Sequence, residues 1–402
     1  MILMERNIFV TPALQLLKDR YTEAGFELWF VGGCVRDSIM GIAPKDIDLT
    51  TSATPEEQVA LYDRYDYHYI ATGLQHGTLT VVIDDEPYEI TTYRIDRETD
   101  GRHAVVEYTR DLRADLERRD LTINAIAMDF DGTIFDPFGG VEDIANRTVR
   151  FVGNANDRIT EDYLRILRYF RFYGRFGNPV YPTGFWGTVQ RFFGRGNGLP
   201  NRQANRAIRK GISGLRQISV ERVWMEVSKI ISGPNASVVA SYMRNMKVFE
   251  TIGMPDGVDA ALSFARKCGV TNPASIMGYY VISPRAIDDI ADAWKWATED
   301  RQRANFIAKN YIKACASPMP FFKEMLVSGT PFDWVADMMR LSGYDPVVLA
   351  DWPIPVMPVT GKDLIERGVT PGPEMGQMLK SMKAAWIKSD YTVDKDTLLS
   401  MM

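Results

Sequence analysis

The sequence is poor in the residues that build disulfide frameworks and most transition-metal sites. Among 402 residues it has three cysteines, Cys34, Cys268 and Cys315, and three histidines. Because the cysteines are odd in number and far apart, they exclude a disulfide framework and a Cys-x-x-Cys zinc site, and they suit a reducing compartment. With so few histidines, we expect no His-ligated metal centre. The remaining candidates for catalysis are carboxylates, arginines and glycine-rich turns.

The sequence also lacks long hydrophobic runs. No apolar stretch approaches the roughly 18 residues that a membrane-spanning helix needs. The region from Met1 to Phe30 carries four acidic residues and no basic segment followed by an apolar one, so we expect neither a secretory signal nor a transit peptide. The sequence therefore predicts a cytoplasmic protein without a membrane partner, and the mitochondrial matrix is the remaining alternative.

Neither sign of charge dominates the whole chain, because 47 lysines and arginines face 52 aspartates and glutamates. The stretch 158–229 differs: its fourteen basic and four acidic residues give +10, so the net charge of −5 leaves −15 for the rest. A basic segment in an acidic protein indicates contact with a polyanion, although a solvated arginine-rich helical face explains it equally well. The length predicts two to four domains, and the 25% of charged residues excludes a mostly disordered chain.

Two kinds of periodicity divide the chain. Up to about residue 150, a helical stretch at 11–23 is followed by short alternating or β-branched runs and by a hairpin whose turn is Asp131-Gly132. Beyond Phe151 apolar residues recur every three to four positions, which predicts helices, with a loop or hinge at 177–203. The sequence thus predicts an α+β protein whose sheet precedes an all-helical remainder. Strands are predicted at 27–31, 47–51, 79–83 and 88–94, and the hairpin at 125–134.

A glycine pair follows the first predicted strand. Gly32 and Gly33 stand between that strand and a helix start, where the backbone can approach a ligand closely and free N–H groups can meet phosphate. Arg36 lies one turn into the helix and can clamp the same anion. Alone, the pair is a weak sign, because most Gly-Gly pairs are only turns.

An acidic pair comes shortly afterwards. The i, i+2 spacing places Asp46 and Asp48 on one face of a strand, and adjacent carboxylates repel unless a cation lies between them. Oxygen ligands favour Mg²⁺ over zinc, and two such metals can activate an attacking hydroxyl and stabilise a leaving pyrophosphate. A lone Asp-x-Asp is usually a solvated strand edge, but the glycine turn makes this pair more specific. Glu89, on a candidate neighbouring strand, is either a third carboxylate or an exposed strand residue.

A second constellation surrounds the pair Arg118-Arg119. Arg119 can take triphosphate oxygens, while Asp120 and Asn124 can fix a ribose. The alternative is that Asp120 or Thr122 simply caps a helix.

The segment 161–172 predicts a helix with an unusual charged side. Thr160 is the expected N-cap, and one apolar stripe faces inward. An ordinary surface helix alternates charge signs, whereas here one aspartate leads three arginines at every third position. These residues are Asp162, Arg165, Arg168 and Arg171.

The Asp162–Arg165 pair suggests a way to select a base without a template. Arginine only donates hydrogen bonds and ionised aspartate only accepts them. The pair therefore suits the adjacent donor and acceptor of cytosine and adenine, and it rejects guanine and uracil, which present them in the opposite order. A site that would leave buried polar groups unpaired rejects the wrong ligand strongly.

In this order, the motifs resemble those of the class II tRNA nucleotidyltransferases, the CCA-adding enzymes, which share their catalytic core with bacterial poly(A) polymerases. The resemblance spans about residues 28–385. The residues at 100–103 and 163–175 are most similar to those of the bacterial and mitochondrial CCA-adding branch. The matching runs are Val31–Asp37, Lys45–Ala53, Tyr88–Arg94, Arg118–Ala127, Phe135–Ile144, Glu161–Phe172, Ile218–Ile231 and Thr360–Met378.

The resemblance implies a nucleotidyltransferase head of the polymerase beta-like type at 1–150, a nucleotide-selecting helical neck at 151–232, a helical body at 233–330 and a helical, tRNA-binding tail at 331–402. It implies Mg²⁺ on Asp46 and Asp48, and it places Glu89 at the family's strand carboxylate. It also implies nucleotide contacts from Gly33, Arg36, Arg119, Asp162, Arg165, Arg168 and Arg171.

The implied reaction adds C, C and A to the 3′ end of tRNA from CTP and ATP, releases pyrophosphate, and uses no nucleic-acid template. The motifs leave three alternatives open. One is an enzyme of the same family that makes poly(A) or adds only CC or only A. The others are a catalytically inactive RNA-binding module and a nucleotidyltransferase that modifies small molecules.

Overall fold

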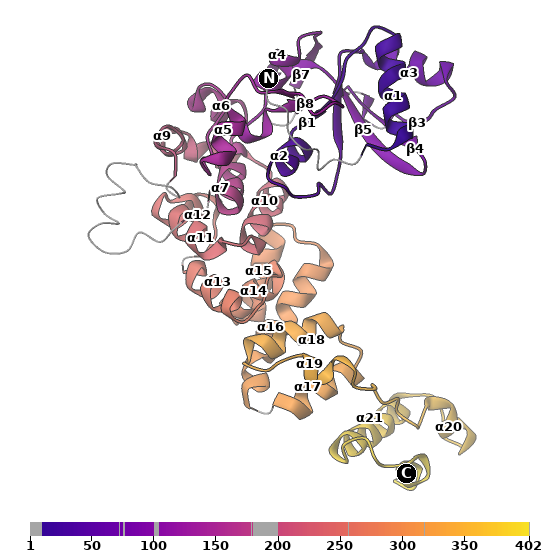
Figure 1. The fold of residues 1–402 in the computed structure, drawn as a ribbon. Helices are drawn as coiled ribbons and strands as arrows, with labels where there is room; N and C mark the ends of the chain where they lie inside the picture. Colours follow the sequence, from indigo (N-terminus) through magenta and orange to yellow (C-terminus); the bar gives the residue numbers. More distant parts are fainter. Residues whose placement is uncertain are drawn as a thin grey trace. The chain divides into compact units, whose positions relative to one another are not determined.

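A computed structural model describes residues 10–71, 73–74, 77–99, 104–177, 179, 200–255, 257–316 and 318–401. The chain forms two compact units, Met1–Asp259 and Ala260–Met402. The first unit contains all the described strands and the helices that follow them, and the described part of the second is helical (Figure 1). The α+β class is therefore confirmed, while the finer division into head, neck, body and tail stays a prediction.

A seven-stranded mixed sheet forms the core of the first unit. Its strand order is β3-β4-β5-β2-β1-β8-β9, and only the β2–β5 pair is parallel. The predicted hairpin is present as β8 and β9. The strands are β1 (Leu28–Val31), β2 (Asp48–Thr51), β3 (His68–Ile70), β4 (Thr78–Ile83), β5 (Glu86–Thr92), β8 (Ala127–Met128) and β9 (Ile134–Phe135), and a separate ribbon pairs β6 (Arg94–Thr99) with β7 (Ala104–Tyr108).

One face of the sheet is buried by α1 (Pro12–Glu23) and α3 (Pro55–Arg64). Each helix begins at a threonine N-cap followed by proline, which satisfies free backbone N–H groups and presets the first turn. Leu17 and Tyr62 from these helices pack in one apolar cluster with Leu49 and Ile90 from the strands. Because side chains alternate along a strand, the neighbouring Asp48 and Glu89 lie on the opposite, open face.

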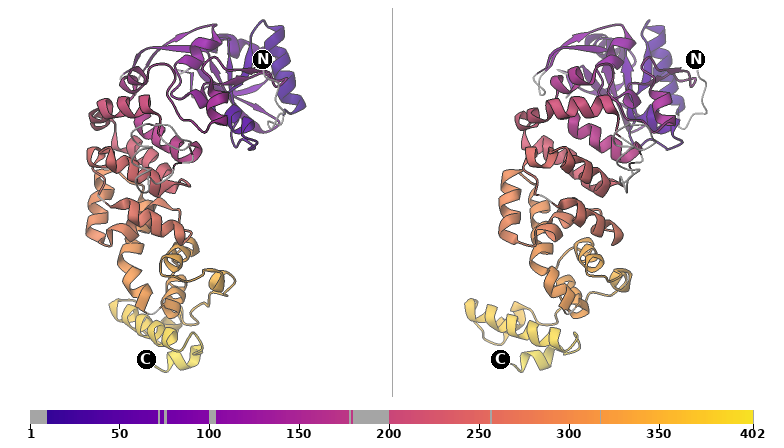
Figure 2. Two further views of the ribbon diagram at one scale, coloured as in Figure 1. Left: turned by 60° about the vertical axis from the view of Figure 1, so that its left-hand side comes forward. Right: turned by 90° about the vertical axis from the view of Figure 1, so that its left-hand side faces the viewer.

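The remaining helices of the first unit either connect strands in the chain or follow the last strand of the sheet (Figure 2). Most of α7 is buried on one side, as the apolar stripe predicted. These elements are α2 (Gly33–Ile39), α4 (Leu112–Glu117), η2 (Thr122–Asn124), α5 (Gly140–Ala145), α6 (Ala155–Glu161), α7 (Arg165–Phe176), α9 (Arg202–Gly211), η3 (Ile212–Gln217), α10 (Val220–Ser232), α11 (Ala236–Asn245) and α12 (Val248–Ile252).

The predicted helix 161–172 is interrupted. Helix α6 ends at Glu161, and Asp162 has extended backbone angles before α7 begins at Arg165. Thr160 is not an N-cap: Asn154 caps α6, and the Thr160 hydroxyl donates to the backbone carbonyl of Asn156. The apolar spacing continues across the break, which is why periodicity alone did not reveal it.

The second unit is built from helices in sequence. In its C-terminal part, Trp386 is buried among Leu364, Met382 and Leu398. Among the described residues, no helix combines the length and apolarity that crossing a membrane requires. The helices are α13 (Val258–Lys267), which spans the division, α14 (Pro273–Val281), α15 (Pro284–Ala293), α16 (Thr298–Ala316), α17 (Pro318–Val327), α18 (Phe332–Leu341), α19 (Val347–Ala350), α20 (Gly361–Glu366), α21 (Pro373–Lys388) and α22 (Lys395–Leu399).

Candidate active site

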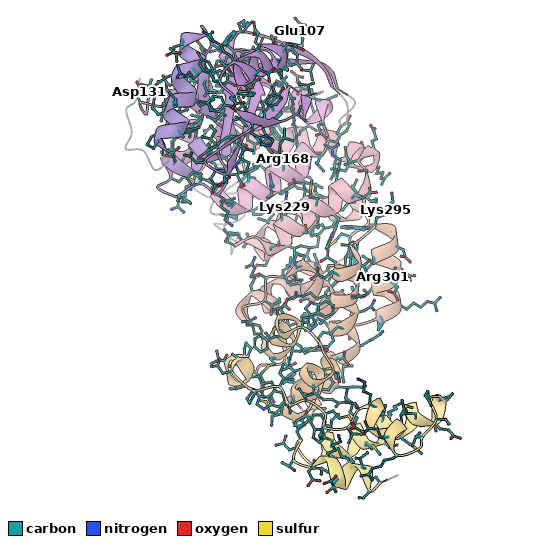
Figure 3. The ribbon with its side chains drawn as sticks, turned by 90° about the vertical axis from the view of Figure 1, so that its right-hand side faces the viewer. Glu107, Asp131, Arg168, Lys229, Lys295 and Arg301 are labelled. Carbon is teal, nitrogen blue, oxygen red and sulfur yellow. The ribbon has the colours of Figure 1, made fainter. Side chains whose placement is uncertain are left out.

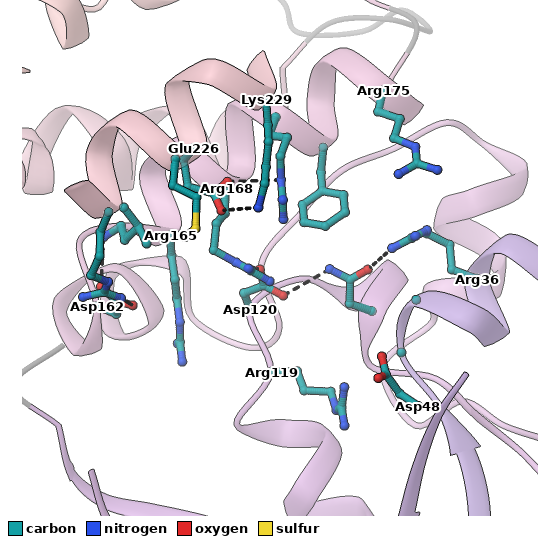
Figure 4. Close-up of a pocket in the computed structure, with 18 of the residues that line it drawn as sticks. Arg36, Asp48, Arg119, Asp120, Asp162, Arg165, Arg168, Arg175, Glu226 and Lys229 are labelled. Carbon is teal, nitrogen blue, oxygen red and sulfur yellow. Dashed lines mark hydrogen bonds and ion pairs between the residues drawn. The ribbon is translucent and has the colours of Figure 1, made fainter. Parts of the chain in front are cut away.

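A cleft of about 1020 Å³ in the first unit brings together residues that are far apart in the sequence (Figure 4). Its walls come from the start of α2, the bend before β2, the segment after α4, and helices α7 and α10. All ten residues predicted to contact a nucleotide line it, as do both predicted metal ligands: Gly32, Gly33, Arg36, Asp46, Asp48, Arg119, Asp120, Asn124, Asp162, Arg165, Arg168 and Arg171. Their roles remain predictions, but their proximity is a property of the fold.

The two carboxylates lie where β2 begins. Asp48 is the first residue of that strand, whereas Asp46 lies in the bend before it. Burial by the surrounding protein raises the pKa of Asp48; Arg119 opposes this shift, and the charge of Asp46 adds to it. A carboxylate whose ionisation is disfavoured in this way is stabilised by a cation placed between the two aspartates.

Glu89 lies directly opposite Asp48 in the parallel β2–β5 register. It is exposed and does not line the main cleft, but it lines an adjoining hollow of about 680 Å³ that also contains Asp46 and Asp48. Among the described residues, no three His, Cys, Asp or Glu side chains are grouped closely enough to hold a metal ion. Mg²⁺ is commonly held in proteins by one or two carboxylates, with substrate and water oxygens as the other ligands.

The glycine turn makes room for an arginine. Gly32 has φ +75°, and a Cβ atom there would lie 2.9 Å from Nη1 of Arg119. Arg36, only 5% exposed, donates to Asp37 and to Oδ1 of Asn124, and its guanidinium lies 4.5 Å from the ring centroid of Phe176. The turn is therefore a packed corner of the cleft as well as a backbone surface.

A buried hydrogen-bonded chain crosses the cleft from α2 to α7. Asn124 accepts from Arg36 and donates to Oδ1 of Asp120, whose other oxygen accepts from Arg168 at 2.6 Å. Burial alone would raise the pKa of Asp120, but Arg168 and Asn124 lower it to about 2. Asp120 and Asn124, predicted to fix a ribose, are thus bonded to the protein itself.

The Asp162–Arg165 pair has a different geometry from the one predicted. Asp162 accepts from the backbone N–H of Leu164 and from Arg222 of α10 at 2.8 Å. Arg165 donates to Glu161 at 2.6 Å and to two backbone carbonyls. Both residues line the cleft, but each is held by a separate partner rather than by one helical face.

Several lining residues were not predicted as site residues. Arg222 and Glu226 are one turn apart on α10, and Glu226 is buried beside Arg171, 3.1 Å away. Their i, i+4 spacing within the matching run 218–231 was the available signal. Figure 3 shows Arg168 and Lys229 on the helices that follow the sheet.

Positive charge dominates the cleft. Ten basic and six acidic side chains line it, an excess of four positive charges. The Nε atom of Arg119 is buried and has no hydrogen-bond partner within the described part of the chain. A buried donor without a partner is costly, so this atom and the surplus of positive charge indicate that a polyanionic ligand belongs in the cleft.

The basic stretch 158–229 divides into two surfaces. Six of its cations line the cleft from α7 and α10. Five others are exposed on α9 and η3, where the range 202–217 has no acidic residue. The latter are Arg202, Arg206, Arg209, Lys210 and Arg216. Two more, Arg191 and Arg195, lie outside the described residues, as do 100–103 and most of the predicted loop 177–203.

Sequence comparisons match both parts of the first unit. A profile described as the Poly A polymerase head domain matches residues 28–150, and one described as the probable RNA and SrmB-binding site of polymerase A matches 201–256. The human protein named CCA tRNA nucleotidyltransferase 1, mitochondrial, is 35% identical over 407 residues, which cover 97% of this chain and 89% of that protein. A Staphylococcus aureus CCA-adding enzyme is 36% identical over 250 residues, 61% of this chain and 56% of that enzyme.

The fold has a matching solved structure. The crystal structure of the Bacillus stearothermophilus CCA-adding enzyme in complex with CTP superposes with a TM-score of 0.75 at 28% identity and covers 94% of each chain.

Proposed function

The chain belongs to the family of CCA tRNA nucleotidyltransferases, and from that premise we propose that it adds C, C and A to the 3′ end of tRNA from CTP and ATP. One observation carries the proposal: two adjacent aspartates and an excess of arginines share a single cleft. This is the combination that nucleotidyl transfer requires, because a metal-bound triphosphate must be held while a hydroxyl attacks it.

Nucleotidyltransferases of this family generally need a divalent metal, and we assign Mg²⁺ to Asp46 and Asp48. The donor set fits, because Mg²⁺ is commonly held by one or two carboxylates together with substrate phosphates. When bound, the ion lowers the pKa of the attacking hydroxyl and neutralises charge at the α-phosphate. Glu89, opposite Asp48 in the register, supports this carboxylate pair from the adjoining hollow.

The arginines of the cleft take the triphosphate. The side chain of Arg119 lies beside Gly32, and its positive charge acts on Asp48. We therefore place Arg119 at the phosphates nearest the metal. Arg171, which lines the cleft and whose Nε lies 3.1 Å from Glu226, supplies a further cation from α7. As the terminal 3′-OH attacks the α-phosphorus, the bond to the β-phosphate oxygen breaks and pyrophosphate leaves, still held by these cations.

We assign base selection to Asp162 and Arg165, with Arg222 as the partner that fixes the aspartate. Arg222 holds one carboxylate oxygen, and the backbone of Leu164 holds the other. Replacing Asp162 and Arg165 together should admit UTP or GTP. If the C and A preference persists in the double variant, the base is selected elsewhere.

The exposed cations of α9 and η3 are assigned to tRNA phosphates. Their range falls within the part of the chain that matches a probable RNA-binding profile. Double-stranded RNA is recognised largely by shape and backbone contact, for which exposed arginines are suited. The proposed setting is the cytoplasm, with the mitochondrial matrix as the alternative, since the human relative is named mitochondrial.

A polymerase of poly(A), or an enzyme adding only CC or only A, uses the same cleft and is distinguished by its product. Purified protein is incubated with tRNA lacking its CCA end, with Mg²⁺ and with CTP and ATP, separately and together. The proposal predicts two cytidines followed by one adenosine and then a stop. Continuous addition of adenosine, or a stop after CC in the presence of both nucleotides, would contradict it.

A further inference from the structure

Behind the wall of the cleft lies a buried carboxylate that does not itself face the ligand space. Asp115 on α4 is 0% exposed and is not among the residues that line the cleft. Two arginines that do line it, Arg118 and Arg119, bond to this carboxylate. An ionised group buried this deeply needs full compensation, and the two arginines provide it.

The contacts divide between the two oxygens of Asp115. Oδ1 accepts from Nε and Nη2 of Arg118, at 2.9 and 2.8 Å, and from the backbone N–H of Arg94 at 3.3 Å. Oδ2 accepts from Nη2 of Arg119 at 3.4 Å. Burial alone would raise the pKa of Asp115, but Arg118 and Arg119 lower it, so the carboxylate is ionised at neutral pH.

Of the two arginines, Arg119 is the one whose charge acts on Asp48, a proposed metal ligand. Its Nη2 is held by Asp115, its Nη1 lies against the backbone of Gly32, and its charge acts on Asp48. The cleft carries an excess of positive charge, which repels any single guanidinium in it. A buried negative charge behind Arg119 offsets that repulsion and fixes one end of the side chain.

We propose that Asp115 is a positioning residue for nucleotide binding: it holds Arg119 where the triphosphate of CTP or ATP must lie. The inference rests on the proposed function and adds to it a residue that touches neither substrate nor metal. Positioning through a buried carboxylate matters because a displaced clamping group loses its contacts with the triphosphate in the bound state and the transition state alike, which raises KM.

The test is the variant Asp115→Asn, which keeps the shape and removes the charge. The KM for CTP and for ATP should rise by the same factor, roughly 10-fold, because the uncharged amide no longer attracts the guanidinium of Arg119. The KM for tRNA should stay unchanged. A merely structural role would instead lower the active fraction, and so kcat, without separating the two substrates.

A double-variant cycle identifies the route of the effect. In an Arg119→Ala background, Asp115→Asn should raise the KM for CTP no further, whereas in an Arg118→Ala background it should still raise it. Asp337→Asn is the matched control, because Asp337 is another buried aspartate bonded by two arginines, in the second unit. This control should leave the KM for CTP unchanged.

Equal effects of Asp115→Asn with and without Arg119 would overturn the inference, as would an unchanged KM for CTP. Should the Asn variant not fold, Asp115→Glu retains the charge, and its KM for CTP should stay within a few-fold of the unchanged protein; a rise as large as that of Arg119→Ala would contradict positioning by charge. Failure of the proposed function is a separate result, because the unchanged protein would then not add C, C and A to tRNA that lacks its CCA end.

Discussion

The molecule contains two clusters of buried aspartate and arginine that differ in what their arginines do. In the second unit, Asp337 accepts hydrogen bonds from Ser275 and Arg303, and Arg303 also donates to Asp333. Every charge there meets an opposite charge inside the protein. In the first unit, Asp115 likewise compensates two arginines, but those arginines continue into a cleft with four surplus positive charges.

The difference teaches how to separate a structural ion cluster from an anion-binding one. Burial and the presence of arginine do not distinguish them, since Asp115 and Asp337 are both buried and both bonded by two arginines. The balance of charge and the buried, unpartnered Nε of Arg119 do, because both point to a ligand that the protein itself does not supply. Four predictions test this distinction.

The largest effect is expected at Asp48. Asp48→Ala should reduce nucleotide incorporation by about 10³-fold or more, because a metal contributes several kcal/mol to transition-state stabilisation. The melting temperature of the metal-free protein should not fall, since burial raises the pKa of Asp48 and its ionised form is disfavoured there. Radiolabelled CTP incorporation and thermal unfolding are measured together. Asp63→Ala, at an exposed position on α3, is the control, and turnover retained in Asp48→Ala would remove the metal assignment.

The second effect concerns the second unit. Arg303→Ala removes the nearer of the two arginines that bond the buried Asp337 and leaves Arg340 at 3.4 Å, so it should reduce the free energy of unfolding by about 3 kcal/mol. The KM for CTP of the folded fraction should be unchanged. Arg301→Ala is the control: Arg301 pairs with Asp288 and Asp292 at the surface (Figure 3), where such pairs contribute about 1 kcal/mol or less. A raised KM for CTP in Arg303→Ala would break the distinction between the clusters.

The third effect is a loss of stability in acid. The pKa of Asp120 is about 2 in the folded protein and roughly 3.9 in an unfolded chain, so the folded state binds the proton less readily. Its contribution, about 3 kcal/mol, is nearly complete above pH 5 and is lost as the pH falls from 5 to 1. Urea unfolding at pH 5, 4, 3 and 2 should show this decrease. In Asp120→Asn the decrease should be smaller, and an identical pH profile would show that the Arg168 pair contributes nothing.

The smallest effect is expected on α9. Replacing Arg206, Arg209 and Lys210 with glutamine should raise the KM for tRNA several-fold and reduce the steepness of its salt dependence, since each phosphate contact releases counterions. The KM for CTP should not change, because these side chains do not line the cleft. Arg64→Gln, at an exposed position on α3, is the control. An unchanged salt dependence in the triple variant would exclude α9 from the tRNA surface.

Much of the fold follows from local patterns. Alternating or β-branched residues predicted four strands, Asp131-Gly132 predicted the hairpin turn, and apolar spacing predicted the helix that is α1, whereas α3 was not predicted. The break in the helix after Glu161 could not be predicted from local patterns, because the apolar spacing continues across it. Asp162 leaves the helix where its carboxylate accepts from Leu164 and Arg222, and the latter is a contact 60 residues away.

The sequence predicted which residues line the cleft, but it did not predict the hydrogen bonds between them. The motifs identified which residues gather in the cleft, since each carries a residue type suited to phosphate, metal or base. They could not show that Asp120 and Asn124 bond to Arg168 and Arg36, because those partners belong to distant elements. Asp115 was missed for a related reason: a buried carboxylate before two arginines is indistinguishable in sequence from a solvated helical ion pair.

The central claim is that Asp46 and Asp48 face the arginines of one cleft in order to hold a metal-bound nucleoside triphosphate. A crystal structure of the protein with CTP and Mg²⁺ tests it most directly. We expect a metal ion on both aspartates, the triphosphate against Arg119, and the cytosine edge at Asp162 and Arg165. CTP bound outside this cleft, or a triphosphate without contact to Arg119, would contradict it.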